Sequence, residues 1–238
     1  MKRTFFILSM LIFSVVANAQ KQFVVDENAE QRTLNGSFNS ILVSGGIDVY
    51  LSQSEEEAIA ISASENKYKD GIKTVVDNNT LKIYYDGEKN WSGKSKHIKV
   101  YISFKNLEKI DASGASDIIV AGEITVPSLL MKLSGASDFK GKLMVSTLTL
   151  DLSGASDVNL TGSASVVNIE SSGASDVKAY DLTTEVCTAK ASGASDVNIT
   201  VSKEMYAHAS GASDIYYKGT AELKDFQTSG ASSIKRKN

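Results

Sequence analysis

The sequence has little cysteine, proline or histidine: one Cys, one Pro and two His among 238 residues. A single cysteine excludes an intramolecular disulfide, so an exported chain of this kind must derive its stability from packing. Cys187 lies in one of a series of sequence repeats, and the other repeats carry Leu, Val or Met at its position. We therefore expect Cys187 to be a buried, inert thiol. His97 and His208 are far apart in the sequence, so we expect neither a metal centre nor a cofactor.

Long apolar runs are absent beyond the first 19 residues. Lys2 and Arg3 precede a mostly apolar stretch from Thr4 to Val16, and Ala17-Asn18-Ala19 has the small-x-small pattern of a cleavage site. Residues 1–19 are therefore predicted to be a secretory signal peptide. The stretch is shorter than the ~20 residues of a spanning helix, so we expect no membrane-spanning segment after cleavage. The expected location is the periplasm, the outer-membrane surface or the medium.

Neither sign of charge dominates. The chain has 25 basic and 28 acidic side chains, a net charge of −3, which becomes −5 without Lys2 and Arg3. Nucleic acids and anionic membranes attract strongly basic surfaces, so this mild acidic balance gives no reason to expect either as a partner.

A repeated pentapeptide, Ser-Gly-Ala-Ser-Asp, occupies residues 113–238 at intervals of 18 to 21 residues. A period of about 20 residues is typical of stacked units that bury their apolar sides against their neighbours. The last of the seven copies has Ser233 in place of Asp. The glycines of the seven copies are Gly114, Gly135, Gly154, Gly173, Gly193, Gly211 and Gly230.

Apolar residues alternate with polar ones on both sides of each glycine. Leu150 and Leu152 precede Gly154, for example, and Val158 and Leu160 follow it. This period of two indicates short strands, while weaker apolar pairs further along suggest a third side to each unit. The chain is therefore predicted to be all-β, a right-handed parallel β-helix with coils of about 19–20 residues.

The pentapeptide is predicted to form a corner of each coil. Glycine allows a positive φ, alanine is small enough to fit inside a tight bend, and Ser and Asp can bond backbone N–H groups. Stacked corners would align the carboxylates about 4.8 Å apart, where adjacent charges repel by about 0.9 kcal/mol in water. The candidate ligand- or cation-binding residues of this ladder are Asp117, Asp138, Asp157, Asp176, Asp196 and Asp214.

Two explanations could account for the stability of such a ladder. Turn N–H groups and serine hydroxyls could bond the carboxylates while water screens the rest. Alternatively, hard cations such as Ca²⁺ could lie between the carboxylates. Known calcium-binding β-rolls repeat every nine residues with more glycines, so the match to them is poor.

Residues 20–112 form an N-terminal β region in which the pattern is looser. Ser44-Gly45-Gly46-Ile47-Asp48 aligns with the pentapeptide as a degenerate first copy, and Asp77-Asn78-Asn79 predicts a tight turn. The region fits longer coils of the same solenoid or an antiparallel meander that closes its N-terminal end. Trp91, in the polar loop 86–94, is a further candidate binding residue because an exposed indole can stack on a sugar; packing back onto the strands is the alternative. Strands are expected near 58–63, 72–76, 80–85 and 97–104.

The Gly-Gly-Ile-Asp at 45–48, the strands after it and the Ser-Gly-Ala-Ser-Asp coils resemble the family described as putative auto-transporter adhesin, head GIN domain. The resemblance covers roughly residues 35–234. It implies a β-helical fold and an adhesin role in exported proteins of Gram-negative bacteria. It implies no reaction, cofactor or site residue.

Repetition argues against catalysis, because catalytic groups need individually tuned surroundings. None of the serines lies in a Gly-x-Ser-x-Gly elbow. We therefore expect a non-catalytic, adhesin-like module that binds glycans or other cell-envelope partners through repeated weak contacts. The alternatives are a structural envelope protein that self-assembles into homo-oligomers and a polysaccharide-active β-helix enzyme.

Overall fold

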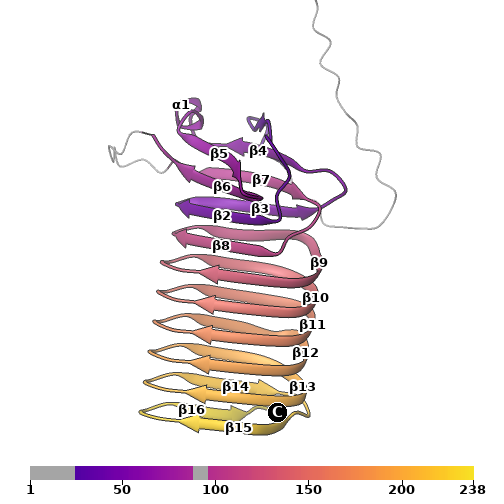
Figure 1. The fold of residues 1–238 in the computed structure, drawn as a ribbon. Helices are drawn as coiled ribbons and strands as arrows, with labels where there is room; N and C mark the ends of the chain where they lie inside the picture. The colour runs from indigo at the N-terminus through magenta and orange to yellow at the C-terminus, as the bar shows by residue number, and fades with distance from the viewer. Residues whose placement is uncertain (1–24, 88–95) are drawn as a thin grey trace, which may run out of the picture.

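The computed structural model describes residues 25–87 and 96–238, which wind into a column of stacked coils (Figure 1). Almost all of the secondary structure is β-strand, and the coils pair in parallel, which confirms the predicted parallel β-helix. The predicted signal peptide and Trp91 lie outside the described residues. In the described part of the chain, no helix has the length and apolar character needed to cross a bilayer.

Each regular coil is one long, curved strand that begins at the Asp of one pentapeptide and ends just before the next. Phe139 pairs with Val158 and Val177 with Val197, so inward positions lie directly over one another. Three shorter strands continue the column, β14 (Asp214–Lys218), β15 (Glu222–Thr228) and β16 (Ser233–Arg236). The long strands are β9 (Asp117–Leu133), β10 (Asp138–Leu152), β11 (Asp157–Ser171), β12 (Asp176–Ala191) and β13 (Asp196–Ala209).

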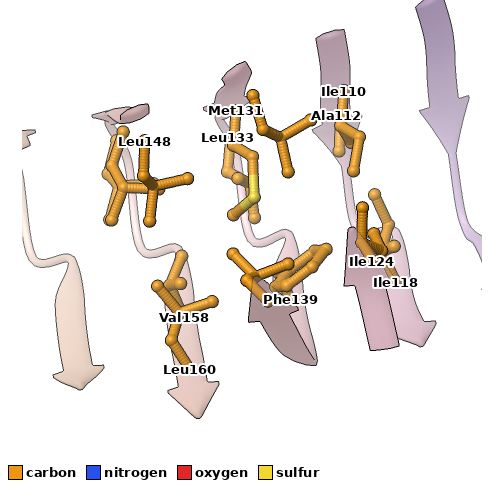
Figure 2. Close-up of a cluster of buried hydrophobic side chains, with 14 of the residues drawn as sticks. Ile110, Ala112, Ile118, Ile124, Met131, Leu133, Phe139, Leu148, Val158 and Leu160 are labelled. Carbon is orange, nitrogen blue, oxygen red and sulfur yellow. The ribbon is translucent and has the colours of Figure 1, made fainter. Parts of the chain in front are cut away.

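The interior of the column is filled by the alternating apolar side chains. In Figure 2, Met131, Leu133 and Leu148 face Phe139 and Val158 across the interior. Alternation within β10 changes phase between Val145 and Leu148, because the strand bends there and turns a third side toward the core. The third side expected from the sequence is therefore present in this coil.

The degenerate first copy belongs to the column. β2 (Ser40–Gly45) and β3 (Ile47–Gln53) flank this corner, and Gly45 pairs in register with Gly114 of β8 (Lys109–Gly114). The chain then passes to the N-terminal end of the column through β4 (Ala58–Ser62), α1 (Asn66–Lys69) and β5 (Ile72–Asp77).

Both arrangements considered for the N-terminal region occur together. β6 (Thr80–Tyr85) and β7 (Ile98–Phe104) form a further parallel coil, pairing with β2 and β3 respectively. Antiparallel pairs of β4 with β7, β5 with β6, and β1 (Glu30–Arg32) with β4 close the end. The predicted turn is confirmed, since Asn78 and Asn79 have φ of 49° and 57° between β5 and β6. Coil β2–β3 therefore lies between β6–β7 and β8–β9, out of sequence order.

Candidate functional site

The second serine of each pentapeptide, not the alanine, occupies the inside of the corner. Ser175 Oγ, for example, donates to the carbonyl oxygen of Ser172 at 3.0 Å. The alanines are exposed, so the expectation that alanine lies inside the bend is wrong. A buried corner carbonyl needs a donor, which a hydroxyl supplies and a methyl group cannot. The serines with no exposed surface are Ser116, Ser137, Ser156, Ser175, Ser195 and Ser213.

The corner glycines stack with their backbones in contact. All seven predicted corner glycines have φ between +76° and +87°. The N–H of Ala174 donates to the carbonyl oxygen of Gly154 in the preceding coil at 2.7 Å, and the same bond recurs down the column. A Cβ placed on Gly173 would lie 2.4 Å from that same oxygen. Successive corners are thus spaced by main-chain contacts.

The stacked corners form a column, called here the corner column, along the left-hand side of Figure 1. The aspartates that follow these corners lie side by side. Asp117 pairs in register with Asp138, Asp157 with Asp176, and Asp196 with both Asp176 and Asp214. The backbone N–H of Asp157 donates to Asp138 Oδ1 at 3.2 Å, which links the first pair of aspartates to the other four. All six predicted aspartates therefore form one ladder.

The ladder has a seventh carboxylate, that of Asp48, beyond the six predicted. Val49 pairs with Ile118, which places Asp48 beside Asp117. The signal was present in the alignment of residues 44–48 with the pentapeptide. At the opposite end Ser233 takes the place of an aspartate and donates to Asp214 Oδ1 at 2.6 Å. The ladder therefore ends on a hydroxyl donor.

Lysine and hydroxyl donors offset part of the repulsion along the ladder. Lys178 Nζ lies 2.9 Å from Asp157 Oδ2 and 3.8 Å from Asp176 Oδ2. The hydroxyl of Tyr216 donates to Asp214 Oδ2 at 2.8 Å. Among the described residues, no group of three or more His, Cys, Asp or Glu side chains could hold a metal ion.

The pKa values of the carboxyl groups differ along the ladder. Burial, followed by the charges of Asp176 and Asp214, raises the pKa of Asp196. Burial also raises the pKa of Asp117, with the charges of Asp48 and Asp138 contributing. The hydrogen bonds from Ser233 and then Tyr216 instead lower the pKa of Asp214.

Asp196→Asn and Asp214→Asn are expected to have opposite effects on stability at pH 7. The fold disfavours ionised Asp196, so the amide should raise the unfolding free energy by less than about 1 kcal/mol. This gain should shrink as pH falls through the raised pKa of folded Asp196 and vanish below the ordinary value of 3.8, where Asp196 is neutral in both states. Ionised Asp214 is favoured, so its variant should lose about 1 kcal/mol at pH 7. That loss should disappear as pH falls from 3.8 through the lowered pKa of folded Asp214.

Thermal melts of the three proteins between pH 3 and pH 7 measure these differences. Destabilisation by Asp196→Asn at pH 7 would show that the carboxylate is a net stabilising group, contrary to the prediction.

Removal of divalent cations is expected to leave thermal stability unchanged, because the donors found along the ladder belong to the chain itself. A ligand bound only to the folded state raises the melting temperature. Melts with and without EDTA, at equal ionic strength, test this. A drop of several degrees with EDTA, reversed by added Ca²⁺, would show instead that cations bridge the carboxylates.

A groove of about 490 Å³ runs beside the corner column, across the ends of β10, β11, β12, β13 and β15. Its lining includes the serines just before the corner glycines and the side chains two positions earlier. The groove arises from the stacking of five coils, so no single repeat reveals it. Its polar lining residues include Asp151, Glu170, Lys190, His208 and Gln227, with Ser172, Ser192, Ser210 and Ser229.

Most charges of the groove are paired between neighbouring coils. Asp151 Oδ2 lies 2.7 Å from Lys132 Nζ, and Glu170 Oε1 lies 3.0 Å from Lys190 Nζ. The Nε2 atom of His208 lies 3.1 Å from Asp225 Oδ2. The groove therefore presents a polar surface without a strong excess of either sign.

Cys187 is fully buried among the apolar side chains of the core, as expected. Burial raises the pKa of its thiol to about 12. Since the thiolate is the reactive form, the thiol is inert at neutral pH.

Known structures share this fold. A putative adhesin from Bacteroides fragilis NCTC 9343 is 24% identical, with a TM-score of 0.79 over 89% of this chain and 98% of that one. A putative lipid binding protein from Parabacteroides distasonis ATCC 8503 is 18% identical, with a TM-score of 0.68 over 90% and 98% of the two chains. A putative adhesin from Parabacteroides merdae ATCC 43184 is also 18% identical, with a TM-score of 0.64 over 88% and 95%. The sequence matches none of the curated proteins.

The family comparison agrees with the repeated corners and the stacked first copy. The model of the family described as putative auto-transporter adhesin, head GIN domain, matches residues 37–221. This range extends from just before β2 to the residue before β15. The chain belongs to this head GIN domain family.

Proposed function

We propose that this protein is a non-catalytic, exported binding module of adhesin type, whose partners are glycans or other cell-envelope polymers. The observation that supports it is the regular outer surface: a carboxylate ladder repeats the same chemistry at successive corners, and a polar groove runs beside it across five coils. Repeated contacts at a fixed spacing suit a polymer, because weak contacts add through multivalency. The adhesin names of the family and of its solved relatives agree with such a role.

The surroundings of the serines and histidines support a role without catalysis. Corner serine hydroxyls such as those of Ser175 and Ser195 donate to backbone carbonyls. Within residues 25–87 and 96–238, no serine hydroxyl is hydrogen-bonded to His97 or His208, as an activated nucleophile would require. The predicted signal peptide and the family's adhesin description are the basis for proposing export.

Binding of the purified protein to a glycan array and to isolated cell-envelope fractions tests the proposed function. We expect retention on at least one polysaccharide, and weaker retention when outward residues of the groove or ladder are changed. Release of reducing ends or unsaturated sugars from the same polysaccharides would contradict the non-catalytic assignment.

Self-assembly is a second candidate function, favoured by one feature of the C-terminal coil. Phe226 on β15 is 61% exposed, which is unusual for a large apolar side chain. Light scattering at increasing protein concentration separates the candidates. Growth into oligomers without glycan binding favours self-assembly, and a constant mass with glycan binding favours the binding module.

A further inference from the structure

We propose that the groove across β10 to β15 binds an uncharged, extended glycan chain along the column axis, with one sugar ring seated against Tyr206. The proposal rests on the proposed function and adds to it a place, an orientation and a ligand class. Three observations support it: the pairing of the groove's charges, the hydrogen-bonding groups left free there, and an aromatic pocket at one end.

The charge pattern of the groove favours a neutral ligand. Asp151 and Glu170 each lie within 3.0 Å of a lysine nitrogen, so these carboxylates are already neutralised by the chain. A polyanion would have to displace Glu170 from Lys190, and a polycation would have to displace the lysines. A neutral sugar hydroxyl can bond such pairs without separating them, because it both donates and accepts.

Free hydrogen-bonding groups gather at the C-terminal part of the groove. Ser172 Oγ donates to the carbonyl of Leu152 at 3.1 Å, and Ser192 Oγ is directed in the same way at the carbonyl of Ser171. In the described part of the chain, no hydrogen bond engages the hydroxyls of Ser210 and Ser229 or the side-chain amide of Gln227, which all line the groove. These groups can bond sugar hydroxyls with no loss of internal bonds.

A smaller pocket of about 210 Å³ adjoins the groove and shares Lys190 and His208 with it. Tyr206 lines this pocket, and its hydroxyl donates to Glu204 Oε2 at 3.0 Å, which fixes the ring. Sugar rings present apolar C–H faces that pack on aromatic side chains. The equivalent outward residues of the preceding coils are Thr149, Asn168 and Thr188, so among these coils only β13 offers a ring.

The spacing of the coils suits an extended chain of sugars. Adjacent coils are about 4.8 Å apart, close to the advance per sugar in a β-1,4-linked chain. The groove spans five coils, so four or five successive sugars could meet equivalent positions. A chain lying across the column would meet only one or two coils and would leave most of the groove empty.

Isothermal titration with three hexasaccharides tests the inference. Cellohexaose and xylohexaose are neutral β-1,4-linked chains, and hexamannuronate is a charged β-1,4-linked chain of the same number of sugars. We expect the protein to bind at least one neutral chain, and to bind hexamannuronate at least tenfold more weakly. Tyr206→Ala should weaken binding about tenfold and Gln227→Ala about threefold. The matched control is Asp111→Ala. Asp111 occupies the outward position equivalent to Gln227, in a coil that does not line the groove.

Gln227 is exposed, so its variant should fold even if Tyr206→Ala does not, and melting curves verify folding for each protein. Neutral chains that bind equally well to wild type, Tyr206→Ala and Gln227→Ala would place the site elsewhere and overturn the inference. Stronger binding of hexamannuronate would overturn the ligand class. A protein that binds envelope fractions but none of the neutral chains would overturn the inference and leave the proposed function intact.

Discussion

Replacement of Gly173 by alanine should lower the unfolding free energy by about 3 kcal/mol, although it adds one methyl group. At φ of +81° an alanine costs about 1–2 kcal/mol relative to the right-handed region. The new Cβ would also lie 2.4 Å from the carbonyl oxygen of Gly154, a backbone atom fixed by its own hydrogen bond. Relief of that contact requires the corners to separate. For a chain of this size the melting temperature should fall by roughly 10 °C.

The matched control is Gly46→Ala in the degenerate corner. Gly46 occupies the alanine position of the pentapeptide, and an added Cβ there meets no atom within 4 Å. Alanine at this site should be neutral or should stabilise by up to about 1 kcal/mol, because it restricts the unfolded chain. Thermal and urea denaturation of the two variants provide the comparison. Equal unfolding free energies for Gly173→Ala and Gly46→Ala would show that the stacked corners do not need glycine.

The second large effect concerns Phe139 and Gly141, which share one volume inside the column. The coils that follow place an aliphatic residue at both positions, as in Val158 and Leu160. In β10 the ring of Phe139 extends into the space that the second side chain would fill. A Cβ on Gly141 would lie 2.7 Å from Val120 Cγ2 and 3.1 Å from Phe139 Cε1. Phe139 is only 2% exposed, so its ring cannot relax into solvent.

Phe139→Val alone is expected to cost about 2–3 kcal/mol, because it leaves a cavity in the core. Gly141→Leu alone should cost a similar amount through overpacking. The double variant reproduces the pair found in the next coil and should recover the part of the loss that comes from the Phe139 ring, while the contact with Val120 remains. Unfolding free energies of the four proteins give a double-mutant cycle, with an expected coupling of at least about 2 kcal/mol. Strictly additive losses would mean that the two positions do not share space.

The regular part of the fold could be predicted from the sequence because each coil repeats the same short sequence pattern. Alternation such as Val158 and Leu160 sets the inward face, and a glycine every 18 to 21 residues sets the corner. The alignment of residues 44–48 with the pentapeptide also identified Gly45 as a corner glycine, which the structure stacks on Gly114. These features are repeated, so even weak signals reinforce one another.

Features that depend on contacts between coils could not be predicted in the same way. Both serine and alanine are small, and only the position of the Ser172 carbonyl decides that Ser175 is the buried one. The N-terminal order is set by pairing between distant segments, since β3 lies between β7 and β9 although β7 follows it in the chain. The groove depends on the outer surfaces of five coils, and Tyr206 acquires its place only through them.

The position of coil β2–β3 between two coils that follow it in the chain affects the time course of folding. Both edges of β2 are occupied by segments that come later in the chain, β6 on one side and β8 on the other. A chain synthesised from its N-terminus therefore cannot complete coil β2–β3 until about residue 120 is available, because β3 also pairs with β9. From that point each new coil can add to a finished template, one after another. Assembly should thus begin with one slow, long-range step and continue by rapid local growth toward the C-terminus.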